Sequence, residues 1–122
     1  MAKILIIDDA KDIQDAVAVI LEGCGHDITS CNSGGAALNA LKETKFDLVI
    51  TDILMPDTDG FDIINFVSSM ENSPSIIAMS GGGVTLSSDQ ALETVENNVD
   101  ALLKKPFSKN VLTLAVENVL KN

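Results

Sequence analysis

The chain alternates between short runs of apolar residues and longer segments in which apolar residues recur every three or four positions. The short runs lie at 4–7, 26–31, 47–51, 75–79 and 101–103, and the longer segments lie at 12–22, 34–43, 61–70, 86–96 and 110–120. Continuous apolar runs are typical of strands buried on both faces of a parallel sheet, and the longer period is typical of amphipathic helices. The pattern therefore predicts a series of βα units.

Units of this kind are joined by right-handed crossovers, which leaves few possible topologies. No linker, repeat or low-complexity segment interrupts the 122 residues, and this length suits one domain. We therefore predict an α/β fold over residues 1–122: a flavodoxin-like (βα)5 three-layer sandwich with parallel strands in the order 2-1-3-4-5.

The composition argues against several classes of function. The formal net charge is -10, every cationic side chain is Lys, and the only aromatic residues are four Phe. The clustered positive charge and the stacking platforms that hold nucleic acids are therefore missing. No apolar run approaches the roughly 20 residues of a membrane span, and the first residues do not resemble a secretion signal. We expect a cytoplasmic protein that binds neither nucleic acid nor membrane.

The two cysteines and the single histidine form no site of their own. Cys24 and Cys31 fit neither a CxxC pair nor a zinc spacing. We expect both thiols to be buried or half-buried in a reducing compartment. His26 precedes a predicted strand, and we interpret it as a structural residue.

Polar side chains follow four of the predicted strands at the point where each strand ends. Asp8 and Asp9 follow the first strand, Asp52 the third, Ser80 the fourth and Lys105 the fifth. In an open parallel sheet, ligands bind beyond the carboxyl ends of the strands, so we expect these side chains to share one site. Converging carboxylates repel one another, and Mg²⁺, which prefers oxygen ligands, relieves that repulsion.

The same residues suit phosphoryl transfer. The Asp52 carboxylate can act as a nucleophile and form an aspartyl phosphate, while a metal ion neutralises the phosphoryl oxygens and orients in-line attack. Lys105 supplies a fixed positive charge to the same oxygens, and the Ser80 hydroxyl and the Gly81 N–H supply hydrogen bonds. Taken singly, Asp8 and Asp9 fit a helix N-cap region and Lys105 fits a solvated surface lysine. Their joint placement favours the site.

These residues lie in segments that resemble a bacterial two-component response-regulator receiver domain of the stand-alone type. The matching segments are 4–9, 48–56, 59–60, 76–81 and 105–107, and the resemblance covers essentially the whole chain. It implies that Asp52 is phosphorylated by a histidine kinase or a histidine phosphotransfer protein. It also implies that Asp9 and Asp52 bind Mg²⁺ directly, Asp8 through water and Leu54 through its carbonyl, with the backbone at Leu54 and Gly81 contacting the phosphoryl group.

The resemblance has further implications around the fifth strand. It implies a cis peptide bond before Pro106. Receivers couple the hydroxyl after strand four, here Ser80, to an aromatic side chain on strand five, but that position is Leu102 in this chain. We therefore expect the aromatic half of the usual switch to be absent, while Ser80 and the glycines at 81–83 can still move toward the phosphoryl group.

Two protein-binding surfaces follow from the same resemblance. The phosphodonor is expected to dock beside the site, on Ala10, Ile13, Pro106 and Phe107, although Ile13 fits the core equally well. The output face is expected on the fourth helix, fifth strand and fifth helix, where Leu114 lies off the inward stripe. This face would bind a downstream protein target.

Alternative functions fit less well. A phosphatase of the haloacid-dehalogenase type also forms an aspartyl phosphate, but it carries a DxDx[TV] arrangement after strand one, which residues 8–11 do not match. A flavin carrier would have a glycine- and hydroxyl-rich phosphate loop there. We expect a binding module that catalyses only its own phosphorylation and dephosphorylation. The alternatives are a receiver that works without phosphate, or, since no effector domain follows Asn122, a receiver fragment of a larger response regulator or hybrid kinase.

Overall fold

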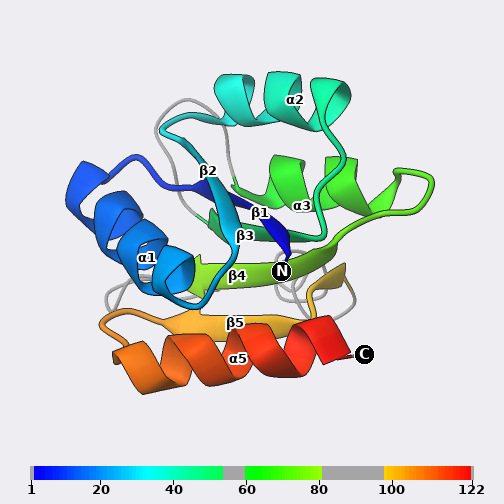
Figure 1. Ribbon diagram of the computed structural model, residues 1–122. Coiled ribbons are helices and arrows are strands. Elements are labelled where there is room, and N and C mark those ends of the chain that lie inside the picture. The colour runs from blue at the N-terminus through cyan, green and yellow to red at the C-terminus, as the bar shows by residue number, and fades with distance from the viewer. Residues whose placement is uncertain (1, 54–59, 81–97, 122) are drawn as a thin grey trace.

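The computed structural model describes residues 2–53, 60–80 and 98–121, which form a parallel sheet with helices on both faces (Figure 1). The strands are β1 (Lys3–Ile7), β2 (Asp27–Cys31), β3 (Leu48–Asp52), β4 (Ser75–Ser80) and β5 (Ala101–Lys104). The helices are α1 (Lys11–Gly23), α2 (Gly34–Glu43), α3 (Gly60–Ser68) and α5 (Lys109–Lys121). The helix predicted at 86–96 lies outside the described residues.

The sheet has the strand order β2-β1-β3-β4-β5, all neighbours being parallel, which confirms the predicted topology. The register aligns Ile7 with Thr51 between β1 and β3, and Asp52 with Met79 between β3 and β4. It also aligns Ser80 with Lys104 between β4 and β5. The polar residues at the strand ends are thereby gathered along one edge of the sheet.

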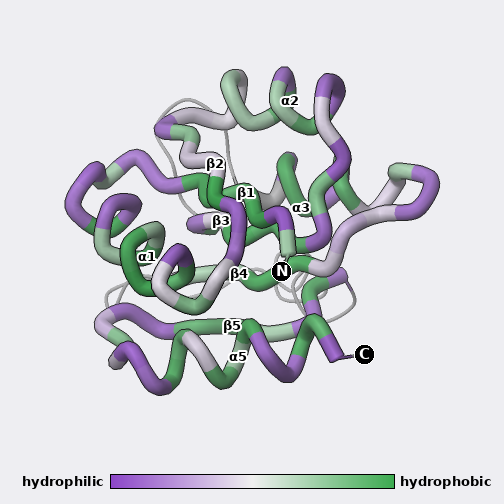
Figure 2. The backbone as a smooth tube through the Cα atoms, viewed as in Figure 1, coloured by the Kyte–Doolittle hydropathy of each residue, from purple (hydrophilic) through white to green (hydrophobic). Residues whose placement is uncertain are grey.

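The core is divided by the sheet into two apolar clusters, which are mostly aliphatic. One lies against α2 and α3 and the other against α1 and α5, and consecutive residues of β1 alternate between them. Ile4, Leu5, Ile6 and Ile7 are all fully buried, because β1 is covered on both faces. Burial of each such side chain stabilises the fold by about 1.5–3 kcal/mol. In Figure 2, hydrophobic colour predominates along β1 and β5, whereas β2 is mixed and the turns are mostly hydrophilic.

The structure around the turn after α1 bears on the predictions made for the two cysteines and for His26. Cys31 is buried, as predicted, but Cys24 is exposed, so its predicted burial was wrong. Cys24 is the C-cap residue of α1 and lies beyond Leu21, the last buried position of the helix. The ring of His26 has a structural contact, since its Nδ1 accepts a hydrogen bond of 3.1 Å from the Ala2 N–H.

In the described part of the chain, no helix is both long enough and apolar enough to cross a membrane.

Candidate functional site

Three of the predicted acidic residues come together at the carboxyl edge of the sheet. Asp8, Asp9 and Asp52 each offer one carboxylate oxygen, and these oxygens lie within 4.8 Å of one another. Asp8 is fully buried and Asp52 is 8% exposed, whereas Asp9 is exposed to solvent. The cluster is therefore open to an ion from the side of Asp9.

The backbone after β1 positions the Asp8 side chain. The Asp8 N–H donates to the carbonyl of Cys31 at the end of β2, at 3.1 Å. Its carboxylate oxygen Oδ1 accepts a hydrogen bond of 2.9 Å from the N–H of Ala10. Ala10 is the N-cap residue of α1, and it makes no side-chain cap bond. The Asp8 carboxylate is therefore fixed by the backbone at the start of α1.

Lys105 reaches the cluster from the end of β5. Its ammonium Nζ donates to Oδ2 of Asp8 at 2.7 Å and to Oδ2 of Asp52 at 3.1 Å. Its own backbone N–H donates to the carbonyl of Ser80 at 2.7 Å, which extends the pairing of β4 with β5. The peptide bond between Lys105 and Pro106 is cis, which confirms the expectation drawn from the resemblance.

The surroundings of Lys105 favour its charged form. Burial by itself would lower the pKa of the ammonium, since desolvation disfavours a charge. The hydrogen bond to Asp8 and the negative charges of Asp52 and Asp8 outweigh that effect, so the pKa of Lys105 is raised above its ordinary value. Lys105 therefore stays positively charged between the two carboxylates at neutral pH.

Ser80 lies at the same edge as Asp52. It is the last residue of β4, it is 7% exposed, and it follows Met79, the residue paired with Asp52 in the register. Leu54 and Gly81, the two backbone positions predicted to complete the site, lie outside the described residues.

Three of the four predicted docking residues, Ile13, Pro106 and Phe107, line a groove that includes Lys105. The groove has a volume of about 140 Å³, and its walls come from α1 and from the segment after β5, namely Ile13, Ala16, Val17, Ile20, Lys105, Pro106 and Phe107. Ile13 is half-buried, so it contributes both to the core and to the groove. Ala10 is also half-buried.

The surface formed by β5 and α5 carries exposed apolar side chains. Leu114 is 57% exposed, as predicted, and Val111 on the same helix is 48% exposed. Leu102, at the position where the resemblance expects an aromatic residue, is 40% exposed.

Sequence reasoning missed one buried polar residue beside the site. Gln14 of α1 is 7% exposed, and its side-chain Nε2 donates to the carbonyls of Cys31 at 2.7 Å and Asp8 at 3.3 Å. A signal was present in the sequence, because Gln14 lies three residues before Val17 and seven before Leu21, on the inward stripe. A polar residue on a buried stripe needs a partner, which points to a specific contact.

The donor set fits a hard divalent cation. Three carboxylates and one ammonium lie close together, so negative charge is in excess. Every candidate ligand atom in the cluster is a carboxylate oxygen. Mg²⁺ prefers this type of ligand and keeps several waters, which an exposed side such as that at Asp9 permits. The residues present therefore suit a magnesium site.

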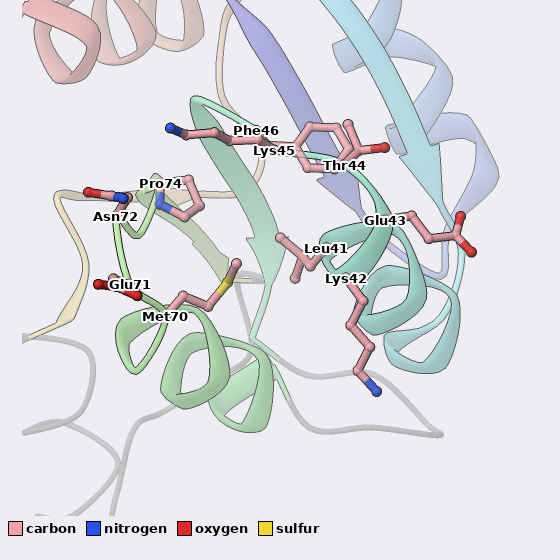
Figure 3. Close-up of a pocket in the computed structure, with 10 residues that line it drawn as sticks. All are labelled: Leu41, Lys42, Glu43, Thr44, Lys45, Phe46, Met70, Glu71, Asn72 and Pro74. Atoms are coloured by element: carbon pink, nitrogen blue, oxygen red, sulfur yellow. The ribbon is translucent and has the colours of Figure 1, made fainter.

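Another pocket is remote from this chemistry. A cavity of about 260 Å³ lies between the end of α2 and the turn after α3, with Leu41, Phe46, Met70 and Pro74 among the residues that line it (Figure 3). It borders the segments that lead into β3 and β4, so it opens at the amino ends of the strands. The acidic cluster lies at their carboxyl ends.

Comparisons with known proteins agree with this geometry. The sequence pattern of the response regulator receiver domain matches residues 4–117. The chain is 31% identical over 120 residues to the response regulator SaeR of Staphylococcus epidermidis, covering 98% of this chain and 51% of that protein. It is 30% identical over 121 residues to the two-component response regulator ARR11 of Arabidopsis thaliana, covering 98% of this chain and 22% of that protein. The chain thus spans about half of the first relative's length and about a fifth of the second's.

A solved structure shows the same fold. The response regulator receiver domain protein from Clostridium thermocellum superposes with a TM-score of 0.86 at 28% sequence identity, over 99% of this chain and 95% of that one. Such domains are not conventional enzymes. With an acidic cluster at the expected edge of the expected sheet, the chain belongs to the family of response regulator receiver domains.

Proposed function

We propose that this chain is the phosphoacceptor of a two-component phosphorelay and that Asp52 receives the phosphoryl group. The observation that carries the proposal is the meeting of Asp8, Asp9 and Asp52 within 4.8 Å, with Lys105 bonded to two of them. The phosphodonor is a histidine kinase or a histidine phosphotransfer protein, in the cytoplasm. A downstream protein then binds according to the phosphorylation state.

The transfer uses Asp52 as nucleophile. A carboxylate oxygen of Asp52 attacks phosphorus, a C–O–P linkage forms, and the bond from phosphorus to the donor histidine nitrogen breaks with its electron pair left on that nitrogen. Lys105 lies 3.1 Å from Asp52 and is positioned to follow the negative charge from the carboxylate to the phosphoryl oxygens. The Ser80 hydroxyl and the backbone at Leu54 and Gly81 complete the proposed contacts.

Magnesium is part of the proposal. Asp9 and Asp52 would hold Mg²⁺ directly, Asp8 through water, and the Leu54 carbonyl would complete the protein ligands. When bound, the ion neutralises the phosphoryl oxygens and orients the transfer. Without it, the excess negative charge of the cluster repels an incoming phosphoryl group.

The test is chemical phosphorylation. Incubation with Mg²⁺ and acetyl phosphate should raise the intact mass by one phosphoryl group, and beryllofluoride should occupy the same site. Asp52→Asn should abolish the gain, whereas Asp62→Asn, a matched change at an exposed position of α3, should not. Wild-type protein that stays unmodified under these conditions would contradict the proposal and would favour a receiver that works without phosphate.

Residues of the groove beside Lys105 allow docking of the phosphodonor to be tested separately from the transfer reaction. We propose that a helix of the phosphodonor docks on Ala10, Ile13, Pro106 and Phe107, since three of these residues line an apolar groove whose wall includes Lys105, which is bonded to Asp8 and Asp52. Phe107→Ala should slow transfer from a protein donor and leave transfer from acetyl phosphate unchanged. Equal loss with both donors would show that Phe107 supports the site and not the docking.

The output of the switch is proposed on the face formed by β5 and α5, with Ser80 as the residue that responds to phosphate. Leu102 lacks the aromatic ring on which the usual switch depends. If Leu102→Ala changes neither partner affinity nor its phosphate dependence, Leu102 takes no part in switching. The relatives named above are longer than this chain, which keeps open the alternative of a receiver within a larger regulator.

A further inference from the structure

The contacts of Gln14 suggest a role that reaches beyond packing. Its side-chain Nε2 carries two hydrogens and donates to two backbone carbonyls, that of Cys31 at 2.7 Å and that of Asp8 at 3.3 Å. The paired register of β1 and β2 ends with Ile7 opposite Cys31, so these carbonyls lie where the ladder stops. A side chain from α1 therefore ties together the ends of two strands.

Asp8 is held at each of its other polar groups as well. Its N–H donates to Cys31, its Oδ1 accepts from the Ala10 N–H, and its Oδ2 accepts from Lys105. These contacts fix the residue up to its Cα and along its side chain. The bond from the Ala10 N–H to Oδ1 spans the Asp8–Asp9 peptide group and restrains the torsion ψ of Asp8 in part, and the bond from Gln14 is a second restraint, made to the Asp8 carbonyl itself.

That torsion decides where Asp9 lies. The Asp8 carbonyl and the Asp9 nitrogen belong to one planar peptide group, so fixing the direction of the carbonyl also fixes the direction in which Asp9 leaves the strand. Asp9 is exposed, with little packing of its own to hold it. Its carboxylate is nevertheless close to those of Asp8 and Asp52.

We infer that Gln14 is a positioning residue that holds the Asp8–Asp9 peptide plane so that Asp9 faces the metal. This inference rests on the proposed function, because it assumes that the acidic cluster binds Mg²⁺. Partners that orient metal ligands typically change affinity 10–100-fold when they are removed. Since Gln14 acts through the backbone, we expect an effect near the lower end, about tenfold.

The variant for the test is Gln14→Met, which has nearly the same length and volume and no donor. The Asp8 carbonyl then loses its bond to the side chain, and the Asp8–Asp9 peptide plane is held less firmly. Mg²⁺ affinity, measured by titration calorimetry on the folded protein, should fall about tenfold. The amide signal of Asp9 should also shift in the magnetic resonance spectrum, because it reports the hydrogen bond to the carbonyl before it.

A matched control lies at the other end of the same strand. Asp47 Oδ2 accepts a hydrogen bond of 2.8 Å from the Lys3 N–H at the start of β1. Asp47→Ala should lower stability without changing Mg²⁺ affinity when salt screens the lost charge. If Gln14→Met binds Mg²⁺ as tightly as wild type, or if Asp47→Ala weakens binding equally, the positioning role is wrong.

The outcomes separate this inference from the proposed function. If wild-type protein binds no Mg²⁺, both the proposed function and the role of Gln14 are wrong. If wild-type protein binds Mg²⁺ and is phosphorylated, and Gln14→Met binds Mg²⁺ equally well, only the role of Gln14 is wrong. If Gln14→Met does not fold, the wild-type protein provides the test. The side-chain amide signals of its Gln14 should be protected from solvent exchange. They should also move together with the amide signal of Asp9 during the Mg²⁺ titration. Signals that do not move overturn the role.

Discussion

At the scale of single residues, the charge balance of the site depends on Lys105. Its ammonium lies between carboxylates that come from β3 and from the segment after β1, and its side chain is 17% exposed. The fully buried Asp8 has no comparable access to water. Removing the lysine would leave that carboxylate with less compensation, which is costly in a protein interior.

Lys105→Ala should therefore lower the free energy of unfolding of the metal-free protein by about 2 kcal/mol. Mg²⁺ binding should be retained, since the oxygen ligands remain, while the response to phosphorylation should weaken. Urea unfolding followed by circular dichroism measures the first effect. Lys104→Ala, the same charge change at an exposed neighbour, is the control. Equal unfolding midpoints for the two variants would refute the stabilising role.

The pH dependence of this contact has a definite sign. The pKa of Lys105 is raised in the folded protein, mainly because bonds to Asp8 and Asp52 overcome the effect of burial. A raised pKa means that the folded state binds the proton more tightly, so the stabilisation is complete below the unfolded value. It is lost only at alkaline pH, as the pH rises through the raised pKa of Lys105 in the folded protein.

The two cysteines should react at very different rates. Cys24 is exposed and Cys31 is buried, and burial raises the pKa of the Cys31 thiol, which lowers the fraction of reactive thiolate. In native protein, a disulfide reagent should label one thiol quickly and the second only on unfolding. Cys24→Ser should remove the fast phase. A fast phase that survives this change would place Cys31 at the surface.

Sequence reasoning worked best for residues whose place depends on topology. Asp8, Asp52 and Lys105 were predicted together because the end of a parallel strand fixes the sheet edge at which a residue lies. Gln14 was missed because a helical pattern counts polar residues as outward-facing, and its partners are backbone carbonyls, which no side-chain pattern marks. Cys24 was misjudged because residue type predicts burial poorly at the end of a helix.

At the scale of elements, α2 shows how a weak helix is started. It begins with Gly34 and Gly35, which are poor helix formers. Ser33 is its N-cap, and the Ser33 hydroxyl oxygen accepts a hydrogen bond of 3.2 Å from the Ala36 N–H. The helix covers one face of the sheet and contributes the buried residues Ala37 and Leu41 to that core cluster.

Ser33→Ala should lower the free energy of unfolding by about 1 kcal/mol, because an N-terminal amide of α2 then loses its acceptor. The matched control is Ser30→Ala, which removes the same hydroxyl from an exposed position of β2. Urea unfolding of both variants is the measurement. If Ser30→Ala destabilises the protein as much as Ser33→Ala, the cap is not the cause.

The element boundaries show where the apolar pattern stops being informative. The fourth strand was predicted to end at Met79, but β4 continues to Ser80, whereas β3 ends at Asp52, as predicted. The pattern depends on side chains, whereas a strand continues for as long as its backbone pairs, and polar residues pair as well as apolar ones. For this protein the difference matters, because the added residue, Ser80, belongs to the candidate site.

At the scale of the whole molecule, folding brings like charges together at the site, and their repulsion opposes folding. The chain carries a formal net charge of -10, and three of its carboxylates are gathered at one edge of the sheet. Two apolar clusters and a continuous parallel ladder supply the stability that holds them there. A cation that binds only the folded arrangement would therefore stabilise the entire domain.

Mg²⁺ should raise the free energy of unfolding by about 1.4 kcal/mol when its concentration is ten times the dissociation constant, because the unfolded chain does not assemble the carboxylates. NaCl at equal ionic strength should do less, since screening weakens repulsion without filling the site. Asp9→Ala should remove the difference between the two salts, and Glu117→Ala, the loss of an exposed carboxylate on α5, should preserve it. Thermal unfolding of the three proteins in both salts is the measurement. Equal stabilisation by the two salts in wild type would mean that the acidic residues respond to ionic strength alone and form no specific cation site.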